Sequence, residues 1–112
     1  MITITDEFMR DMLAKTKLYS VVLLTRTPKR DADGADAIVW EHGRRNFELR
    51  ASGALSIVCP VTEARGLSGV AIFDRPVGEV RDIMESDPAI RAGLFTFEVY
   101  AVRSFPGDRL PS

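Results

Sequence analysis

The sequence predicts an α+β domain: a four-stranded antiparallel sheet with two helices on one face, in the ferredoxin-like split βαβ order (βαββαβ). Two observations predict it. After a short N-terminal helix, the hydrophobic pattern follows the order strand, helix, strand, strand, helix, strand. Several of these strands are apolar on both faces, as in a sheet that is covered on both sides. With 112 residues, 46% of them hydrophobic, the chain suffices for one domain with a real core.

Local signals place the first elements. A threonine followed by two acids predicts a helix over residues 5–16. Residues 18–25 read LYSVVLLT and predict a strand whose centre does not alternate, so we expect it to be buried on both sides. Residues 27–33 contain a proline and mixed charges, which predicts a loop.

A long helix is predicted over residues 34–52, ending at Gly53 in a left-handed cap. Its apolar pattern is divided between two stripes, and which of them faces the core stays open. One stripe holds Trp40, Gly43 and Phe47, and the other holds Ile38, His42, Arg45 and Leu49.

Two strands and a turn follow this helix. Residues 54–61 alternate and place Cys59 on the same face as Leu55, so we expect the thiol to be buried and to pack rather than react. A turn over residues 60–66 then leads to a strand over residues 69–74, which predicts a hairpin.

The last third contains a helix over residues 76–86 and a strand over residues 95–103. Between them, Asp87 precedes a proline. A residue in that position leaves the α region, so Asp87 is expected to end one helix and cap the next, with Gly93 closing the turn.

Residues 18–104 are therefore the predicted core, residues 1–17 an N-terminal helical extension and residues 105–112 a flexible tail. Because no third core helix follows, one face of the sheet lacks a cover. We expect a homodimer in which two such faces pack together.

Composition excludes several function classes. Fifteen Lys and Arg against sixteen Asp and Glu give a net charge of -1, so we expect no nucleic-acid partner. One cysteine and one histidine exclude an internal disulfide and predict neither a metal site nor a metal cofactor. No apolar stretch could cross a bilayer and the start MITITDEF lacks a signal-peptide pattern, so we expect no membrane partner and a cytoplasmic location.

Generic motifs for nucleotide binding and serine hydrolysis are missing. Arg44, Arg45 and Arg50 could hold an anion, but charges on a long helix usually form a solvated face. His42 is the natural base or acid near neutral pH, although a lone histidine on a helix is more often structural. Asp87 could orient that imidazole as well as cap a helix.

The order and spacing of several short segments resemble the YCII-related family of dimeric α+β barrels. The resemblance covers residues 18–104. The matching segments are His42, Gly53 eleven residues later, a strand reaching Pro60, Asp87-Pro88, and Ala92-Gly93-Leu94 leading to Phe97-Glu98-Val99.

The resemblance implies that His42 and Asp87 form a catalytic dyad at a cleft between helices and sheet. It also implies lyase-like or dehalogenating chemistry on a small molecule. The chain has Cys59-Pro60 where the family usually has Gly-Pro, and residues 66–69 replace a Gly-Gly-like segment. The N-terminal helix is also additional, and these departures leave the substrate open.

Two functions follow from these observations. The first is a small cofactor-independent enzyme in which Asp87 orients His42, and His42 moves a proton on a small organic substrate. The second is a non-catalytic dimeric module that binds a small molecule or a partner, with both residues only stabilising the fold.

Overall fold

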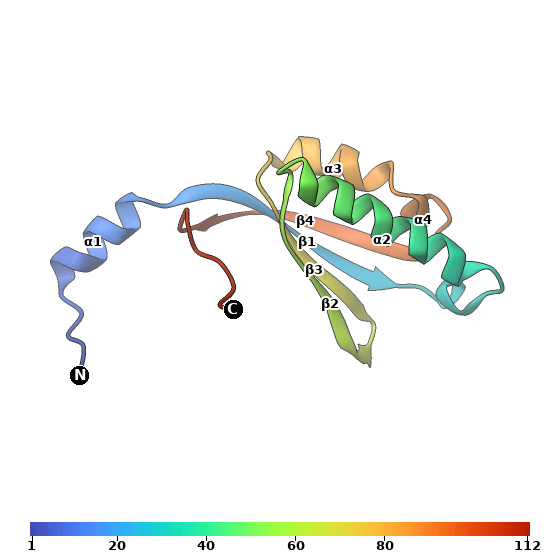
Figure 1. Ribbon diagram of the computed structural model, residues 1–112, viewed down its shortest axis with the longest axis horizontal. Helices are drawn as coiled ribbons and strands as arrows, with labels where there is room; N and C mark the ends of the chain where they lie inside the picture. The colour runs from blue at the N-terminus through green and yellow to red at the C-terminus, as the bar shows by residue number, and fades with distance from the viewer.

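A computed structural model describes residues 1–112 and shows the predicted α+β architecture (Figure 1). The elements are α1 (Asp6–Ala14), β1 (Lys17–Arg26), the 3-10 helix η1 (Pro28–Asp31), α2 (Ala35–Ala51), β2 (Leu55–Arg65), β3 (Leu67–Phe73), α3 (Val77–Glu85), α4 (Pro88–Arg91) and β4 (Phe95–Ser104). None of these helices combines the length and the apolar character needed to cross a membrane.

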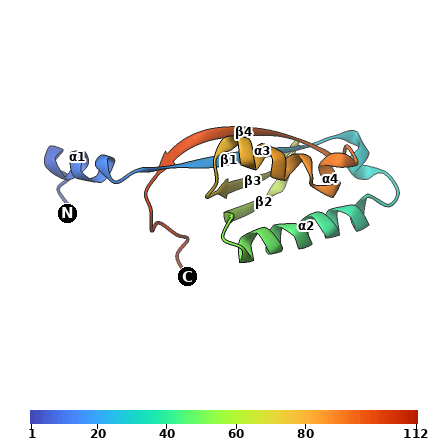
Figure 2. The same ribbon diagram turned by 90° about the horizontal axis from the view of Figure 1, so that it is seen from above.

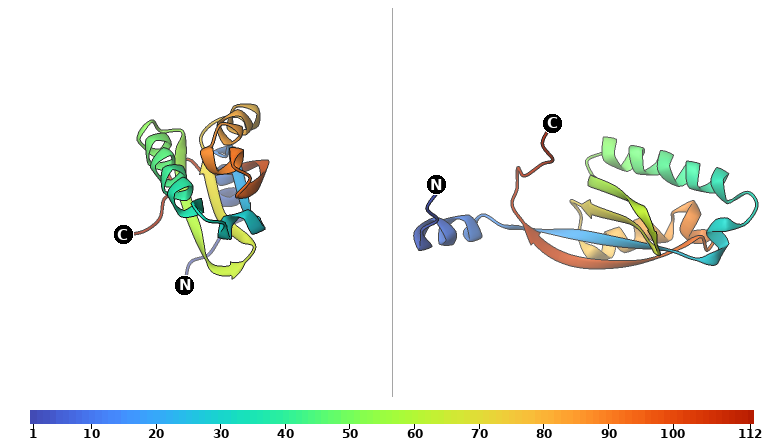
Figure 3. Two further views of the ribbon diagram at one scale, coloured as in Figure 1. Left: turned by 90° about the vertical axis from the view of Figure 1, so that its right-hand side faces the viewer. Right: turned by 90° about the horizontal axis from the view of Figure 1, so that it is seen from below.

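The four strands form one sheet in the order β2-β3-β1-β4, and each neighbouring pair is antiparallel. Helices α2 and α3 lie side by side over the same face of this sheet (Figures 2 and 3). The predicted split βαβ order and the single helical layer are therefore confirmed.

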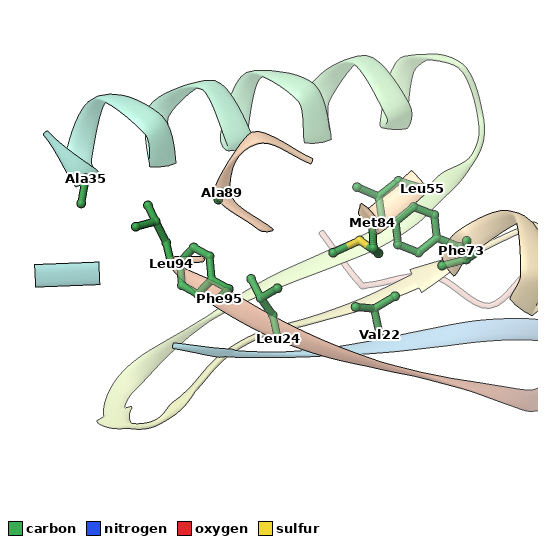
Figure 4. Close-up of a cluster of buried hydrophobic side chains, with 10 residues drawn as sticks. Val22, Leu24, Ala35, Leu55, Phe73, Met84, Ala89, Leu94 and Phe95 are labelled. Carbon is green, nitrogen blue, oxygen red and sulfur yellow. The ribbon is translucent and has the colours of Figure 1, made fainter. Parts of the chain in front are cut away.

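The core lies between the helices and the sheet (Figure 4). Val22 and Leu24 alternate along β1 and are both buried, and Phe73 from β3 is 1% exposed. On the helical side, Val80 and Met84 lie four residues apart on α3, which places both on its buried face. The core thus joins strand β1, in the interior of the sheet, to helix α3.

The other face of the sheet is not covered in the single chain. Ser20, Val22 and Leu24 are buried, whereas the alternating Val21 and Leu23 are only partly buried. The prediction that β1 is buried on both sides is therefore wrong for one protomer, because no second layer of the same chain packs on that face.

The structure decides which stripe of α2 faces the core. Ile38 and Leu49 pack against the core, whereas Trp40 and Phe47 are 70% and 68% exposed. His42 shares the inward stripe, so the fold turns the only imidazole toward the sheet.

The predicted turn over residues 60–66 is wrong. Strand β2 continues through Pro60 to Arg65, and the chain reverses at Gly66, whose φ of +89° suits glycine. A proline is tolerated inside this strand because β2 is an edge strand with only one hydrogen-bonded neighbour.

Helix α1 begins as predicted, with the Thr5 side chain accepting a hydrogen bond from the Phe8 N–H at 3.1 Å. None of its residues is buried. It projects beyond the end of the sheet, away from the rest of the domain (Figures 1 and 2).

Candidate active site

His42 lies near the middle of α2, which begins after Gly34 and ends before Gly53. Gly53 has a φ of +85°, so the left-handed cap predicted for this helix is confirmed. The His42 side chain is 13% exposed, and its ring centroid lies 5.8 Å from that of Phe95 on β4. The helix therefore holds the imidazole at the edge of the core.

Asp87 lies at the junction of α3 and α4 and is 1% exposed. As predicted, it is the N-cap of α4, with Pro88 in the first turn. Its Oδ1 accepts a hydrogen bond of 2.8 Å from the Ala89 N–H. Because this contact uses one carboxylate oxygen, Oδ2 is available to another group.

The fold brings His42 and Asp87, 45 residues apart in the chain, into direct contact. His42 Nδ1 lies 2.7 Å from Asp87 Oδ2. An ionised carboxylate can only accept, so Nδ1 carries a proton, and in the neutral ring Nε2 therefore keeps a lone pair. The Asn46 amide nitrogen lies 3.4 Å from Nε2, on the next turn of α2, and fits the same tautomer.

Arg45 is a third member of this cluster that the sequence analysis did not identify. Its Nη1 lies 3.6 Å from Asp87 Oδ2 and is buried without a hydrogen-bond partner. Arg44, by contrast, is exposed and pairs with Glu41 at 3.0 Å. The solvated-face interpretation therefore holds for Arg44 and is wrong for Arg45.

The surroundings of Asp87 favour its ionised form. Burial raises the pKa of the Asp87 carboxyl, but the hydrogen bond and charge of His42 and the backbone N–H groups of Ala89 and Ile90 outweigh burial. The pKa of Asp87 therefore lies below its ordinary value. This keeps the carboxylate negative and acceptor-only near neutral pH.

The lowered pKa of Asp87 predicts an acid-sensitive contribution to stability. A carboxyl whose pKa is lowered on folding stabilises the protein above its unfolded-state pKa of about 3.9, and this contribution is lost as pH falls through the folded-state pKa. Urea unfolding should show wild type more stable than Asp87→Asn at pH 7, with the difference shrinking below about pH 4. A difference that does not change with pH would contradict this origin.

A cavity of about 260 Å³ lies between α2 and the sheet, and ten of its sixteen lining residues are hydrophobic. His42 and Asn46 line it from the helix, and Val22, Phe73 and Phe95 are among those lining it from the sheet. Asp87 does not line the cavity. Of these two side chains, only the imidazole can therefore touch a ligand in the cavity.

The prediction that Cys59 is buried is wrong, because the residue is exposed. The register of β2 on β3 shifts between Leu55, which pairs with Phe73, and Ile57, which pairs with Ile72. Adjacent residues of β3 point to opposite faces, so this irregularity moves Ile57 and Cys59 away from the face of Leu55. Cys59 nevertheless borders the cavity, beside Pro60.

No group of three or more His, Cys, Asp or Glu side chains is arranged to hold a metal ion. The polar side chains that line the cavity are those of His42, Asn46, Cys59 and Ser68.

Comparisons with known proteins match this chain by structure. No family model matches the sequence, and no curated protein matches it. Among solved structures, 5-chloro-2-hydroxyhydroquinone dehydrochlorinase (TftG) from Burkholderia phenoliruptrix, in complex with 2,5-dihydroxybenzoquinone, superimposes with a TM-score of 0.54. The match has 17% sequence identity and covers 75% of this chain and 91% of that chain. The two proteins share the α+β fold.

Proposed function

We propose that this protein is a small enzyme in which His42 performs general acid/base chemistry on a small organic molecule. One observation carries the proposal: a buried carboxylate holds the only imidazole of the chain, at 2.7 Å, in the wall of an apolar cavity. We also propose that it belongs to the YCII-related family, from the matching positions of His42 and Asp87 and the shared fold.

The geometry assigns a separate role to each ring nitrogen. Nδ1–H donates to Asp87, which fixes the ring and stabilises the positive charge that forms when the ring takes a second proton. Nε2 has the free lone pair and accepts the substrate proton. Asp87 is a positioning residue in this scheme. The Asn46 amide, which lies 3.4 Å from Nε2, exchanges this contact for a hydrogen bond to the substrate when the substrate binds.

Among the reactions that a single base can perform, we propose an elimination, the class to which the dehydrochlorination named for the structural neighbour belongs. A substrate C–H or O–H proton passes to His42 Nε2, the bonding electrons form a new double bond, and the leaving group departs with its own electron pair. The sum is loss of HX with no net oxidation, so the step needs no redox partner. The protonated imidazole then returns its proton to solvent.

The cavity limits the substrate. Its volume of about 260 Å³ is below the range of about 300–1,000 Å³ for drug-sized ligands, and its walls are mainly apolar. A small ring with one or two polar groups fits these walls. The structural neighbour is a dehydrochlorinase of a chlorinated hydroxyhydroquinone, and we propose halogenated hydroxyaromatic compounds as the first class to test.

A chloride-release assay tests the proposal. The purified protein is incubated with a panel of chlorinated hydroxyhydroquinones and catechols, beside His42→Gln and an enzyme-free blank. We expect chloride release from at least one compound with wild type only. Saturable binding without release, equal in wild type and His42→Gln, would overturn the enzymatic function and support the small-molecule binding module.

We further propose that the protein is a homodimer that packs through the uncovered sheet face. Val21 and Leu23 of β1 lie on this face opposite Ile72 and Val70 of β3, which are also apolar and only partly buried. An exposed apolar surface of this kind marks an interface, and a second copy of the chain supplies an identical surface.

Leu23→Glu should dissociate this dimer, because the substitution places a charge in the centre of the apolar face. Sedimentation equilibrium should give twice 12.4 kDa for wild type and 12.4 kDa for the variant. Leu18→Glu is the matched control, since Leu18 lies on the same strand but on the opposite face and is 67% exposed. A monomeric wild type at micromolar concentration would contradict the dimer.

A further inference from the structure

Helix α1 presents an apolar surface that nothing in its own chain covers. Phe8, Met9 and Leu13 lie along one side of the helix and are each about half exposed, at 50%, 50% and 51%. A helix of nine residues is too short to be stable in water by itself and usually depends on tertiary packing. This side of α1 therefore needs a surface to pack against.

The outer side of α2 carries a second uncovered apolar surface. Trp40, Gly43 and Phe47 lie along one stripe and line a groove of about 500 Å³, here named the α2 groove. A Cβ atom at Gly43 would meet no atom within 4 Å, so the helix surface is open at this position, between Trp40 and Phe47 along the stripe. Glycine weakens a helix interior, and no contact within the chain explains its presence here.

We propose that α1 of one protomer docks in the α2 groove of its partner. From Phe8 to Leu13 the apolar side of α1 is about 8 Å long, and the stripe from Trp40 to Phe47 is about 10 Å long, so the groove is long enough to hold it. The net charges have opposite signs, because α1 carries three acids against one base, whereas the groove is lined by two arginines and one acid, Asp36. Arg30 and Arg44 each hold one acid of their own chain and retain further N–H donors.

The junction between α1 and β1 directs α1 away from its own chain. The Thr16 hydroxyl donates to the Leu13 carbonyl at 2.9 Å, and the Lys15 N–H donates to the Met12 carbonyl at 3.0 Å. Lys17 then pairs with Asp74 at 2.8 Å. With only two residues between the helix and the strand, these bonds hold α1 beyond the sheet, while α2 lies over it (Figures 1 and 3).

Docking in the α2 groove would connect the partner to the candidate active site. Val39 and Gly43 line both the groove and the cavity that His42 lines. A helix bound in the groove therefore covers the outer side of the segment that forms the cavity wall. The partner subunit thereby completes the enclosure of the site, and this inference depends on no particular reaction.

Trp40 is the only tryptophan of the chain and lies in the groove, so its fluorescence reports on docking. We expect weak quenching by acrylamide, a neutral probe, in the wild-type protein. The full-length variant Phe8→Ser/Met9→Ser/Leu13→Ser should show several-fold stronger quenching and a red-shifted emission. Arg10→Ser, on the polar side of α1, is the matched control and should behave as wild type. Equal quenching in wild type and the triple variant would overturn the proposal.

A mixed dimer distinguishes docking on the partner from docking within one chain. The triple variant, which retains Trp40, is co-expressed with a Trp40→Phe chain that has an intact α1 and no tryptophan. Two different affinity tags isolate the mixed dimer. Protection of Trp40 in this species is the expected result, because the intact helix comes from the other chain. A tryptophan that stays exposed would show docking within one chain and overturn the proposal.

Discussion

Replacing His42 with glutamine is expected to lower turnover by about 10²–10⁴-fold, the usual contribution of a general base. Glutamine keeps a polar group near Asp87 but has no lone pair that can take a proton near neutral pH. The measurement is kcat for the substrate identified by halide release. Glu41→Gln is the matched control, since Glu41 is the preceding residue of α2 but its side chain is 55% exposed and pairs with Arg44.

Asp87→Asn separates the two roles of the carboxylate in the same assay. Asparagine caps a helix about as well as aspartate, so the fold should be kept. The imidazole loses its adjacent charge, and kcat should fall about tenfold to a hundredfold with KM nearly unchanged. If the Asp87→Asn variant were fully active, the only role of Asp87 would be to cap α4.

Asp87→Ala is expected to have the largest effect on stability, about 3–5 kcal/mol of the free energy of unfolding. The substitution removes the cap of α4 and leaves the Ala89 N–H and the His42 Nδ1–H without their acceptor. It also removes the carboxylate that lies 3.6 Å from Arg45 Nη1, a buried nitrogen with no hydrogen-bond partner. Urea denaturation followed by circular dichroism measures the loss.

Asp82→Ala is the matched control for that experiment. Asp82 lies on α3, five residues before Asp87, and is exposed. Its removal should change the free energy of unfolding by no more than about 0.5 kcal/mol. If the two alanine variants unfolded at the same urea concentration, the cluster around Asp87 would have no stabilising role.

The sequence predicted most elements because their signals are local. Thr5 and Asp87 cap the helices expected of them, Gly53 ends α2, and the order of apolar patterns matches the order of strands and helices. The contact between His42 and Asp87 was inferred from their spacing and a family resemblance. Its catalytic meaning stays a proposal.

Other features depend on pairing between distant segments. The register shift in β2 is a property of its pairing with β3, so alternation alone placed Cys59 on the wrong face. Arg45 could not be assigned to Asp87 because α3 and α4 lie about forty residues further along the chain. The position of Asn46, four residues after His42 on the same helix, is a local signal that predicts its contact with the imidazole.

In the proposed enzyme, the residues that perform the reaction and the residues that select the substrate lie on different elements. The carboxylate is held by α4 and the imidazole by α2, whereas much of the cavity wall comes from the strands, with Val58 and Ala71 as examples. Substitutions at those wall positions can change the size of molecule admitted without moving either member of the pair. One helical layer could therefore serve a series of related proteins with different substrates, each distinguished by the residues of its sheet.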